Sequence, residues 1–87
     1  MNIVGIGERL KQLRDERDMS MDNLVADLNQ KYELNLTKSM VSRWEANKND
    51  PSLTYARVIV KYFNVSLDWL LGLTDKRTPP QFRKEGK

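Results

Sequence analysis

Apolar residues recur along this chain at intervals of three and four, the spacing of one face of an α-helix. The first such stretch covers about 6–17, and four more begin after Ser20, Thr37, Ser52 and Ser66, whose hydroxyl groups suit the helix N-cap. The apolar positions that define the five stretches are Ile6, Leu10 and Leu13, then Leu24, Val25 and Leu28, then Met40, Val41 and Trp44, then Leu53, Ala56, Ile59, Val60 and Phe63, then Leu67, Leu70 and Leu71. No stretch shows the sustained alternation that marks a β-strand. The pattern therefore predicts an all-α fold of five short helices around one core.

The composition narrows the function classes that such a fold could serve. The chain has 87 residues, enough for one domain, and 31% of them are charged. No run approaches 18 consecutive apolar residues, and the first residues lack the basic start of a signal peptide, so we expect a cytoplasmic protein outside the membrane. Cysteine and histidine are absent, which removes the commonest metal ligands and the commonest general base. The acidic residues are scattered, so we expect no enzyme, no metal and no cofactor.

The net charge of +3 belongs to the end of the chain. Residues 76–87 hold five basic residues and one acid, which leaves ten basic and eleven acidic residues in 1–75. Gly72 suits the end of the last helix, and Pro79-Pro80 interrupts regular structure soon after it. We therefore predict a folded domain over 1–75 and a basic, disordered tail or linker over 76–87. The tail could attract phosphates or be inert, but the prolines favour a linker, which could lead to a C-terminal oligomerisation or sensing domain.

The stretch after Thr37 differs from the other four in what its outer face carries. With Thr37 as the N-cap, Val41 and Trp44 face inward. The outward positions near the start of this helix are Lys38, Ser39, Ser42 and Arg43. Long cationic side chains and short hydroxyls are the groups that contact phosphates and base edges in the major groove of DNA. The same residues would suit an ordinary solvated helix face, and the pattern alone favours neither interpretation.

Several blocks of the sequence resemble the lambda-repressor-like helix-turn-helix family. These blocks span about residues 6–73 and are Leu10-Lys11-Gln12-Leu13-Arg14, Met19-Ser20, Leu24, Val41-Ser42-Arg43-Trp44-Glu45, Asn49-Asp50-Pro51-Ser52-Leu53 and Asn64-Val65-Ser66-Leu67-Asp68-Trp69-Leu70-Leu71-Gly72. The resemblance implies a five-helix bundle whose third helix, about 38–47, lies in the major groove of double-stranded DNA. It further implies a transcriptional repressor of the phage type that binds a two-fold operator as a homodimer.

The resemblance also assigns roles to individual residues. Those that would contact base edges are Lys38, Ser39 and Arg43. Those that would hold phosphates are Ser42, Asn47, Lys48 and Asn49. Trp44 would belong to the core, while Arg14 and Glu45 match positions that form an ion pair between the first helix and the end of the third. Such a pair could fix the recognition helix without adding much net stability.

Two departures from the family pattern bear on DNA binding. The family commonly has a phosphate-binding glutamine after the cap of its second helix, but Met21 stands there, so this anchor is missing or is replaced by Asn23. In addition, Leu28 and Leu36 are separated by the seven residues 29–35, where one residue is usual.

The spacing of Leu24, Leu28 and Tyr32 predicts that the second helix continues through this lengthened turn to Lys31 or Tyr32. Leu34 and Leu36 would then anchor the returning chain. The insertion could be a tolerated loop, which loop thermodynamics permits, or it could carry Lys31 or Tyr32 to the DNA backbone. We favour the tolerated loop.

Two further alternatives stay open on the sequence. Trp69 either helps to close the core or forms a dimer surface, and we expect it to be partly buried. The rival to DNA binding is a helical protein–protein interaction module with the same fold. The acidic balance of 1–75 and the presence of Met21 favour this rival, whereas the outer face of Lys38, Ser39 and Arg43 argues against it.

Overall fold

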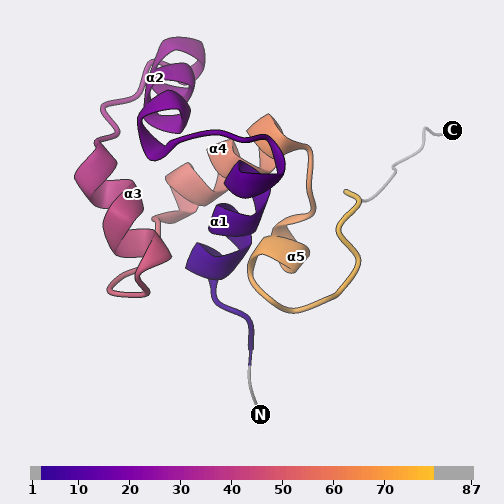
Figure 1. Ribbon diagram of the computed structural model, residues 1–87. Coiled ribbons are helices and arrows are strands. Elements are labelled where there is room, and N and C mark those ends of the chain that lie inside the picture. Colours follow the sequence, from indigo (N-terminus) through magenta and orange to yellow (C-terminus); the bar gives the residue numbers. More distant parts are fainter. Residues whose placement is uncertain (1–2, 80–87) are drawn as a thin grey trace, which may run out of the picture.

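The computed structural model describes residues 3–79, and the regular structure in this range is entirely helical. The helices are α1 (Ile6–Glu16), α2 (Met21–Tyr32), α3 (Lys38–Glu45), α4 (Leu53–Phe63) and α5 (Leu67–Leu70). In Figure 1, α1 lies in the middle of the bundle, with α3 along one side of it and α5 on the other. The predicted all-α bundle of five helices is therefore confirmed.

Four of the helices begin at the hydroxyl side chains that the sequence marked as N-caps. Ser20, Thr37, Ser52 and Ser66 each accept a hydrogen bond from the backbone N–H three residues further on. Each bond satisfies one of the N–H groups that the first turn of a helix leaves unpaired. The first helix is different, because it begins after Gly5 with no side-chain cap.

All five helices are followed by a residue with left-handed backbone geometry. These residues and their φ angles are Asp18 at 53°, Glu33 at 54°, Asn47 at 59°, Asn64 at 56° and Gly72 at 80°. Only the role of Gly72 was expected from the sequence. Because Asn47 turns the chain, α3 ends at Glu45, before the residue at 47 that the sequence suggested.

The core gathers the apolar faces of all the helices. Its buried side chains are Leu10, Leu13, Leu24, Leu28, Leu36, Val41, Trp44, Ala56, Ile59, Phe63, Val65, Trp69 and Leu70. Trp69 is 3% exposed, more deeply buried than expected, because the guanidinium groups of Arg9 and Arg77 lie over its ring at 4.4 and 5.1 Å from the centroid. Trp69 thus helps to close the core, and its ring is not available to a dimer partner in this structure.

The residues just after α5 also contact the helical body. The backbone N–H of Ser66 donates to the carbonyl oxygen of Arg77 over 2.8 Å, and the Arg77 guanidinium forms an ion pair with Glu16 at the end of α1. The sequence places the end of the folded domain at residue 75, and Arg77, which makes these contacts, lies two residues beyond it. The rest of the predicted tail, residues 80–87, lies outside the described residues.

The lengthened turn is an ordered extension of α2. The helix continues to Tyr32, as its apolar spacing predicted, and Leu36 returns into the core. The Asn29 side chain then bonds to both backbone groups of Leu36. Its Nδ2 donates to the Leu36 carbonyl oxygen at 2.9 Å, and its Oδ1 accepts from the Leu36 N–H at 2.8 Å. These two hydrogen bonds fix the backbone of Leu36, two residues before α3 begins.

Candidate nucleic-acid interface

The outer face of α3 exposes the side chains that the sequence assigned to DNA contact. The exposed residues on this helix are Lys38, Ser39, Ser42 and Arg43. On the opposite side, Val41 is fully buried and Trp44 is 5% exposed, as the helical spacing predicted. The Thr37 cap sets this orientation, because its Oγ1 accepts the N–H of Met40 and fixes where the first turn begins.

Two of these side chains make exposed contacts in the free protein. Arg43 Nη1 donates to Ser39 Oγ over 3.0 Å, one helical turn away. Lys38 Nζ lies 3.6 Å from a carboxylate oxygen of Asp22, on the first turn of α2. Contacts of this kind in water contribute little free energy, so both cations can leave them for a stronger acceptor at small cost.

The turn after α3 extends this polar surface. Asn47, Lys48 and Asn49 are all exposed. The backbone N–H groups of Asn47 and Lys48 donate to the carbonyl oxygens of Trp44 and Arg43, each over 3.0 Å, which is the Schellman pattern that closes a helix. The side chains of the turn are therefore carried on a fixed backbone directly after the outer face of α3.

Asn23 lies apart from this group, on the first turn of α2. Its backbone N–H is bonded to Ser20 Oγ, and its side chain is exposed. The contact between Asp22 and Lys38 places that turn of α2 beside the start of α3. Met21 is half-buried and packs against the core, so its side chain serves the interior rather than the surface.

The structure contains the ion pair between Arg14 and Glu45, with the two side chains only 11% and 4% exposed. Arg14 Nε and Nη2 donate to the two carboxylate oxygens of Glu45 over 3.0 and 2.8 Å, and Nη1 donates to the Met19 carbonyl oxygen over 2.8 Å. The hydrogen bonds to Glu45 raise the pKa of Arg14, although burial opposes them. A bidentate ion pair of this geometry fixes the end of α3 against α1 in one orientation.

Gly7 is a second determinant of this packing, and sequence reasoning missed it. A Cβ atom at Gly7 would lie 2.0 Å from the Trp44 carbonyl oxygen and 2.9 Å from the Glu45 Cα. The backbones of α1 and α3 therefore meet at a point that only glycine allows. The available signal was a glycine inside a stretch with helical spacing, where glycine is otherwise unfavourable.

Lys31 and Tyr32, the two residues considered for backbone contact from the lengthened turn, point toward α4. The Lys31 ammonium lies 5.5 Å from the centroid of the Tyr62 ring. Tyr32 lines a hollow whose other walls come from Thr54, Arg57 and their neighbours on α4. The structure therefore does not bring them together with the outer face of α3.

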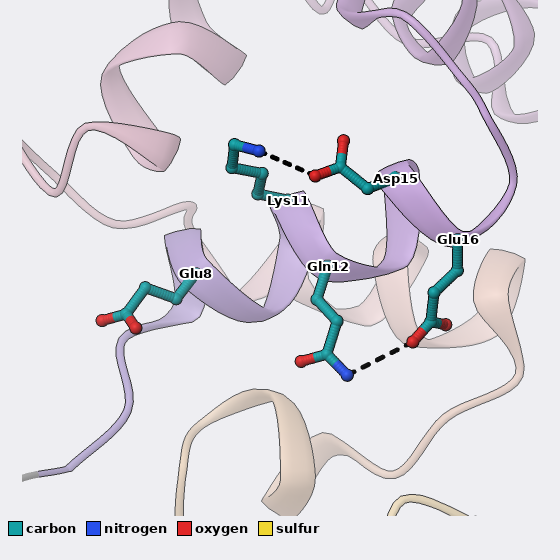
Figure 2. Close-up of a pocket in the computed structure, with 5 residues that line it drawn as sticks. All are labelled: Glu8, Lys11, Gln12, Asp15 and Glu16. Carbon is teal, nitrogen blue, oxygen red and sulfur yellow. Dashed lines mark hydrogen bonds and ion pairs between the residues drawn. The ribbon is translucent and has the colours of Figure 1, made fainter.

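A second hollow, of about 570 Å³, lies on the outer face of α1 and is lined by Glu8, Lys11, Gln12, Asp15 and Glu16 (Figure 2). Lys11 donates to Asp15 over 2.7 Å, which lowers the pKa of that carboxyl group. Gln12 donates to Glu16 over 3.2 Å. Because carboxylates outnumber the one ammonium group, this face would repel phosphate and is no candidate for DNA contact.

Other kinds of site find no support in residues 3–79. No group of three or more acidic, histidine or cysteine side chains there is placed to hold a metal ion. Within the same range, no helix is long and apolar enough to cross a membrane.

The amino-acid sequence is similar to a protein family and to two transcriptional regulators. The sequence profile of the family described as helix-turn-helix matches residues 10–70. The uncharacterized HTH-type transcriptional regulator YobD of Bacillus subtilis (strain 168) is 31% identical over 80 residues, which are 92% of this chain and 66% of the relative. The HTH-type transcriptional activator BcrR of Enterococcus faecalis is 30% identical over 64 residues, 74% of this chain and 28% of the relative. The chain thus spans less than two thirds of either relative.

Proposed function

The chain belongs to the lambda-repressor-like helix-turn-helix family, a non-enzymatic family of DNA-binding proteins, and from this premise we propose that it binds double-stranded DNA sequence-specifically and represses transcription. The observation that carries the proposal is the outer face of α3. Its cations and hydroxyls are exposed on a helix whose position is fixed by the ion pair between Arg14 and Glu45. A rigid helix with such a face suits the major groove, which is wide enough to admit it.

In this proposal, Lys38, Ser39 and Arg43 contact base edges. Arg43 has the planar fork of donors that matches the two acceptors of guanine, the pairing most common in specific contacts. In the free protein the guanidinium lies along the outer face and donates to Ser39, a weak exposed contact that it can exchange for a base. We therefore expect at least one guanine in the half-site.

Phosphate contacts would set the register of α3 in the groove. The residues proposed for them are Ser42 on α3, Asn47, Lys48 and Asn49 in the following turn, and Asn23 on α2. Amide, hydroxyl and ammonium side chains donate to phosphate oxygens without sequence preference, so these residues position the helix and leave specificity to the base contacts.

We propose that two copies bind one operator. One short helix offers few base contacts, and two copies on half-sites about one helical turn apart would multiply the affinity. Sedimentation of the protein with an operator duplex should give two chains for each duplex. A complex of one chain with one duplex at saturation would contradict the dimer.

The experiment that tests sequence-specific binding is a selection of bound duplexes from a random double-stranded pool, with the bound fraction analysed by sequencing. The proposal predicts a motif repeated about a two-fold axis. Retention of DNA without any motif would contradict sequence specificity, and no retention would contradict DNA binding and favour a protein-interaction module.

A reporter gene placed behind the selected motif tests the direction of regulation. A dimer bound across a promoter would exclude polymerase, so we expect expression to fall when the protein is supplied. The name of the relative BcrR describes an activator, and a rise in expression would assign that direction to this chain instead.

A further inference from the structure

A hollow of about 260 Å³ separates the end of α2 from one flank of α4. Its lining residues are Tyr32 on α2 and Thr54, Arg57, Val58 and Lys61 on α4. The four α4 positions follow the spacing of a single helix face, so they form one continuous stripe. Tyr32 and Val58 are half-buried, whereas Thr54, Arg57 and Lys61 are exposed. The site therefore combines partly buried apolar groups with exposed hydrogen-bond donors.

The lengthened turn is what builds this hollow. Tyr32 is the last residue of α2, four residues beyond Leu28, at which the shorter turn of the family would begin. The neighbouring Lys31 lies over the ring of Tyr62, so the added turn of helix packs on α4. The insertion thus supplies Tyr32, which lines the hollow opposite α4 and would be missing from a bundle with the usual turn.

The cations around the hollow have no acidic partner within residues 3–79. Lys31, Arg57 and Lys61 take part in none of the ion pairs there, whereas Lys11, Arg14, Lys38 and Arg77 all do. Glu33 directly follows Tyr32 and is exposed, and it forms no ion pair within the same range. Arg57 and Lys61 lie one helical turn apart on this exposed stripe of α4 and give it a local positive potential, whereas Asp27 accepts a hydrogen bond from Tyr62 beside Lys31.

The first turn of α4 lies beside the end of α3. The rings of Trp44 and Tyr55 are 5.4 Å apart, which holds the first turn of α4 against the end of α3. In Figure 1 the turn that leaves α3 leads directly into α4. In the sequence, the exposed cations Arg43 and Lys48 precede the contact between α3 and α4, and the exposed Arg57 and Lys61 follow it.

We propose that the hollow between α2 and α4 binds the phosphate backbone of double-stranded DNA outside the bases that α3 contacts. Arg57 and Lys61 would pair with phosphates, the hydroxyl of Thr54 would donate to a phosphate oxygen, and Tyr32 with Val58 would pack against the sugars. The inference rests on the proposed DNA-binding function and deepens it, because it gives the lengthened turn a role in extending the footprint.

The test compares how steeply binding falls with salt in three proteins on one duplex that carries the selected motif and long flanks. They are the wild type, the double variant Arg57→Gln/Lys61→Gln, and the charge-keeping double variant Arg57→Lys/Lys61→Arg. Each lost phosphate contact should reduce the slope of log K against log salt by about 0.9, so the neutral variant should lose about 2 and the charge-keeping variant almost nothing. The motif selected from a random pool should be the same for all three proteins.

Several outcomes would overturn the inference. An unchanged slope in the neutral variant would show that no phosphate contacts these residues and would leave the hollow to another partner, such as an acidic protein segment. An equal loss in the charge-keeping variant would trace the effect to disturbed packing instead of charge. In both cases the wild type still binds its motif, so the proposed function survives. Only failure of the wild type to bind DNA would defeat both proposals.

Discussion

Lys48 and Arg43 are both cations near the end of α3, but they occupy different positions relative to the outer face of that helix. Arg43 lies on the outer face of the helix and is bonded to Ser39, whereas Lys48 lies in the turn after Asn47 has reversed the backbone. A side chain on the helix face can reach base edges, and one in the turn is placed for the sugar–phosphate chain. The two residues should therefore differ in what their removal does to binding.

Replacing Lys48 by alanine should weaken binding to every DNA sequence alike. The loss of one phosphate contact should lower the slope of log K against log salt by about one. A salt series on the selected motif and on a scrambled duplex measures both effects. A slope equal to that of the wild type would show that Lys48 does not contact a phosphate.

Glu16 provides a residue-scale test of the contact between α1 and the segment after α5. Hydrogen bonds from Arg77 and then from Gln12 lower the pKa of Glu16 from its ordinary value of 4.5 to about 2. Because the pKa is lowered in the folded state, the stabilisation is present above pH 4.5 and is lost as the pH falls toward 2. Carboxyl-carbon NMR titration of Arg77→Gln should find the Glu16 pKa raised back toward 4.5.

Lys11→Gln is the matched control for this titration. It should raise the pKa of Asp15, which Lys11 lowers, and leave that of Glu16 unchanged. A Glu16 carboxyl group that already titrates near 4.5 in the wild-type protein would show that Arg77 is not held against α1 in solution.

At the scale of elements, the orientation of α3 depends on two features at its ends. Gly7 allows the α1 backbone to approach the carbonyl oxygen of Trp44, and the Asn29 side chain bonds to the backbone of Leu36 just before α3 begins. One feature sets how close α3 lies to α1, and the other sets where the chain enters it. Neither residue touches the proposed DNA surface.

Gly7→Ala should destabilise the fold, although alanine is usually better than glycine in a helix by about 1 kcal/mol. Its methyl group would overlap the Trp44 carbonyl, and overpacking of this kind costs about 1–3 kcal/mol or more. Gly5→Ala is the control, because its Cβ would meet only movable side-chain atoms, those of Asn47 at 3.0 Å and of Glu8 at 3.8 Å. Equal midpoints of urea unfolding for the two variants would contradict this account.

Asn29→Ala should cost about 1–3 kcal/mol of unfolding free energy, because it leaves the N–H and carbonyl of the buried Leu36 unpaired. The adjacent Gln30 is exposed, so Gln30→Ala should change stability by no more than about 0.5 kcal/mol. Denaturant unfolding of both variants measures the difference. If the two variants have the same free energy of unfolding, the hydrogen bonds from Asn29 to Leu36 do not fix the lengthened turn.

The parts of the fold that were predictable are those whose causes are local in sequence. Ser20, Thr37 and Ser66 carry hydroxyls next to apolar stretches of helical spacing, so cap and helix could be inferred together. The left-handed residue Glu33 could not, since its side chain has no preference for that backbone geometry. The burial of Trp69 under Arg9 and Arg77 also escaped prediction, because it depends on three segments that meet only in the folded chain.

At the scale of the whole molecule, acidic and basic side chains lie on different surfaces, although the net charge is only +3. The outer face of α1 carries the three carboxylates Glu8, Asp15 and Glu16 beside a single paired lysine, whereas the outer face of α3 and the exposed stripe of α4 carry cations. A duplex approaching this molecule would be repelled at α1 and attracted at α3. Local arrangement therefore accounts for DNA binding better than the net charge of +3 does.

The central claim, that the outer face of α3 contacts base edges in the major groove, is tested most directly by selecting duplexes with the wild type and with Arg43→Ala side by side. At physiological ionic strength, about 0.15 M, exposed charges more than about 8 Å apart are largely screened, so specific contacts dominate the comparison. The account predicts a loss of about 1–3 kcal/mol on the wild-type motif and relaxed preference at one position of each half-site, with the other positions retained. An unchanged motif, or a loss of equal size on every sequence, would contradict it.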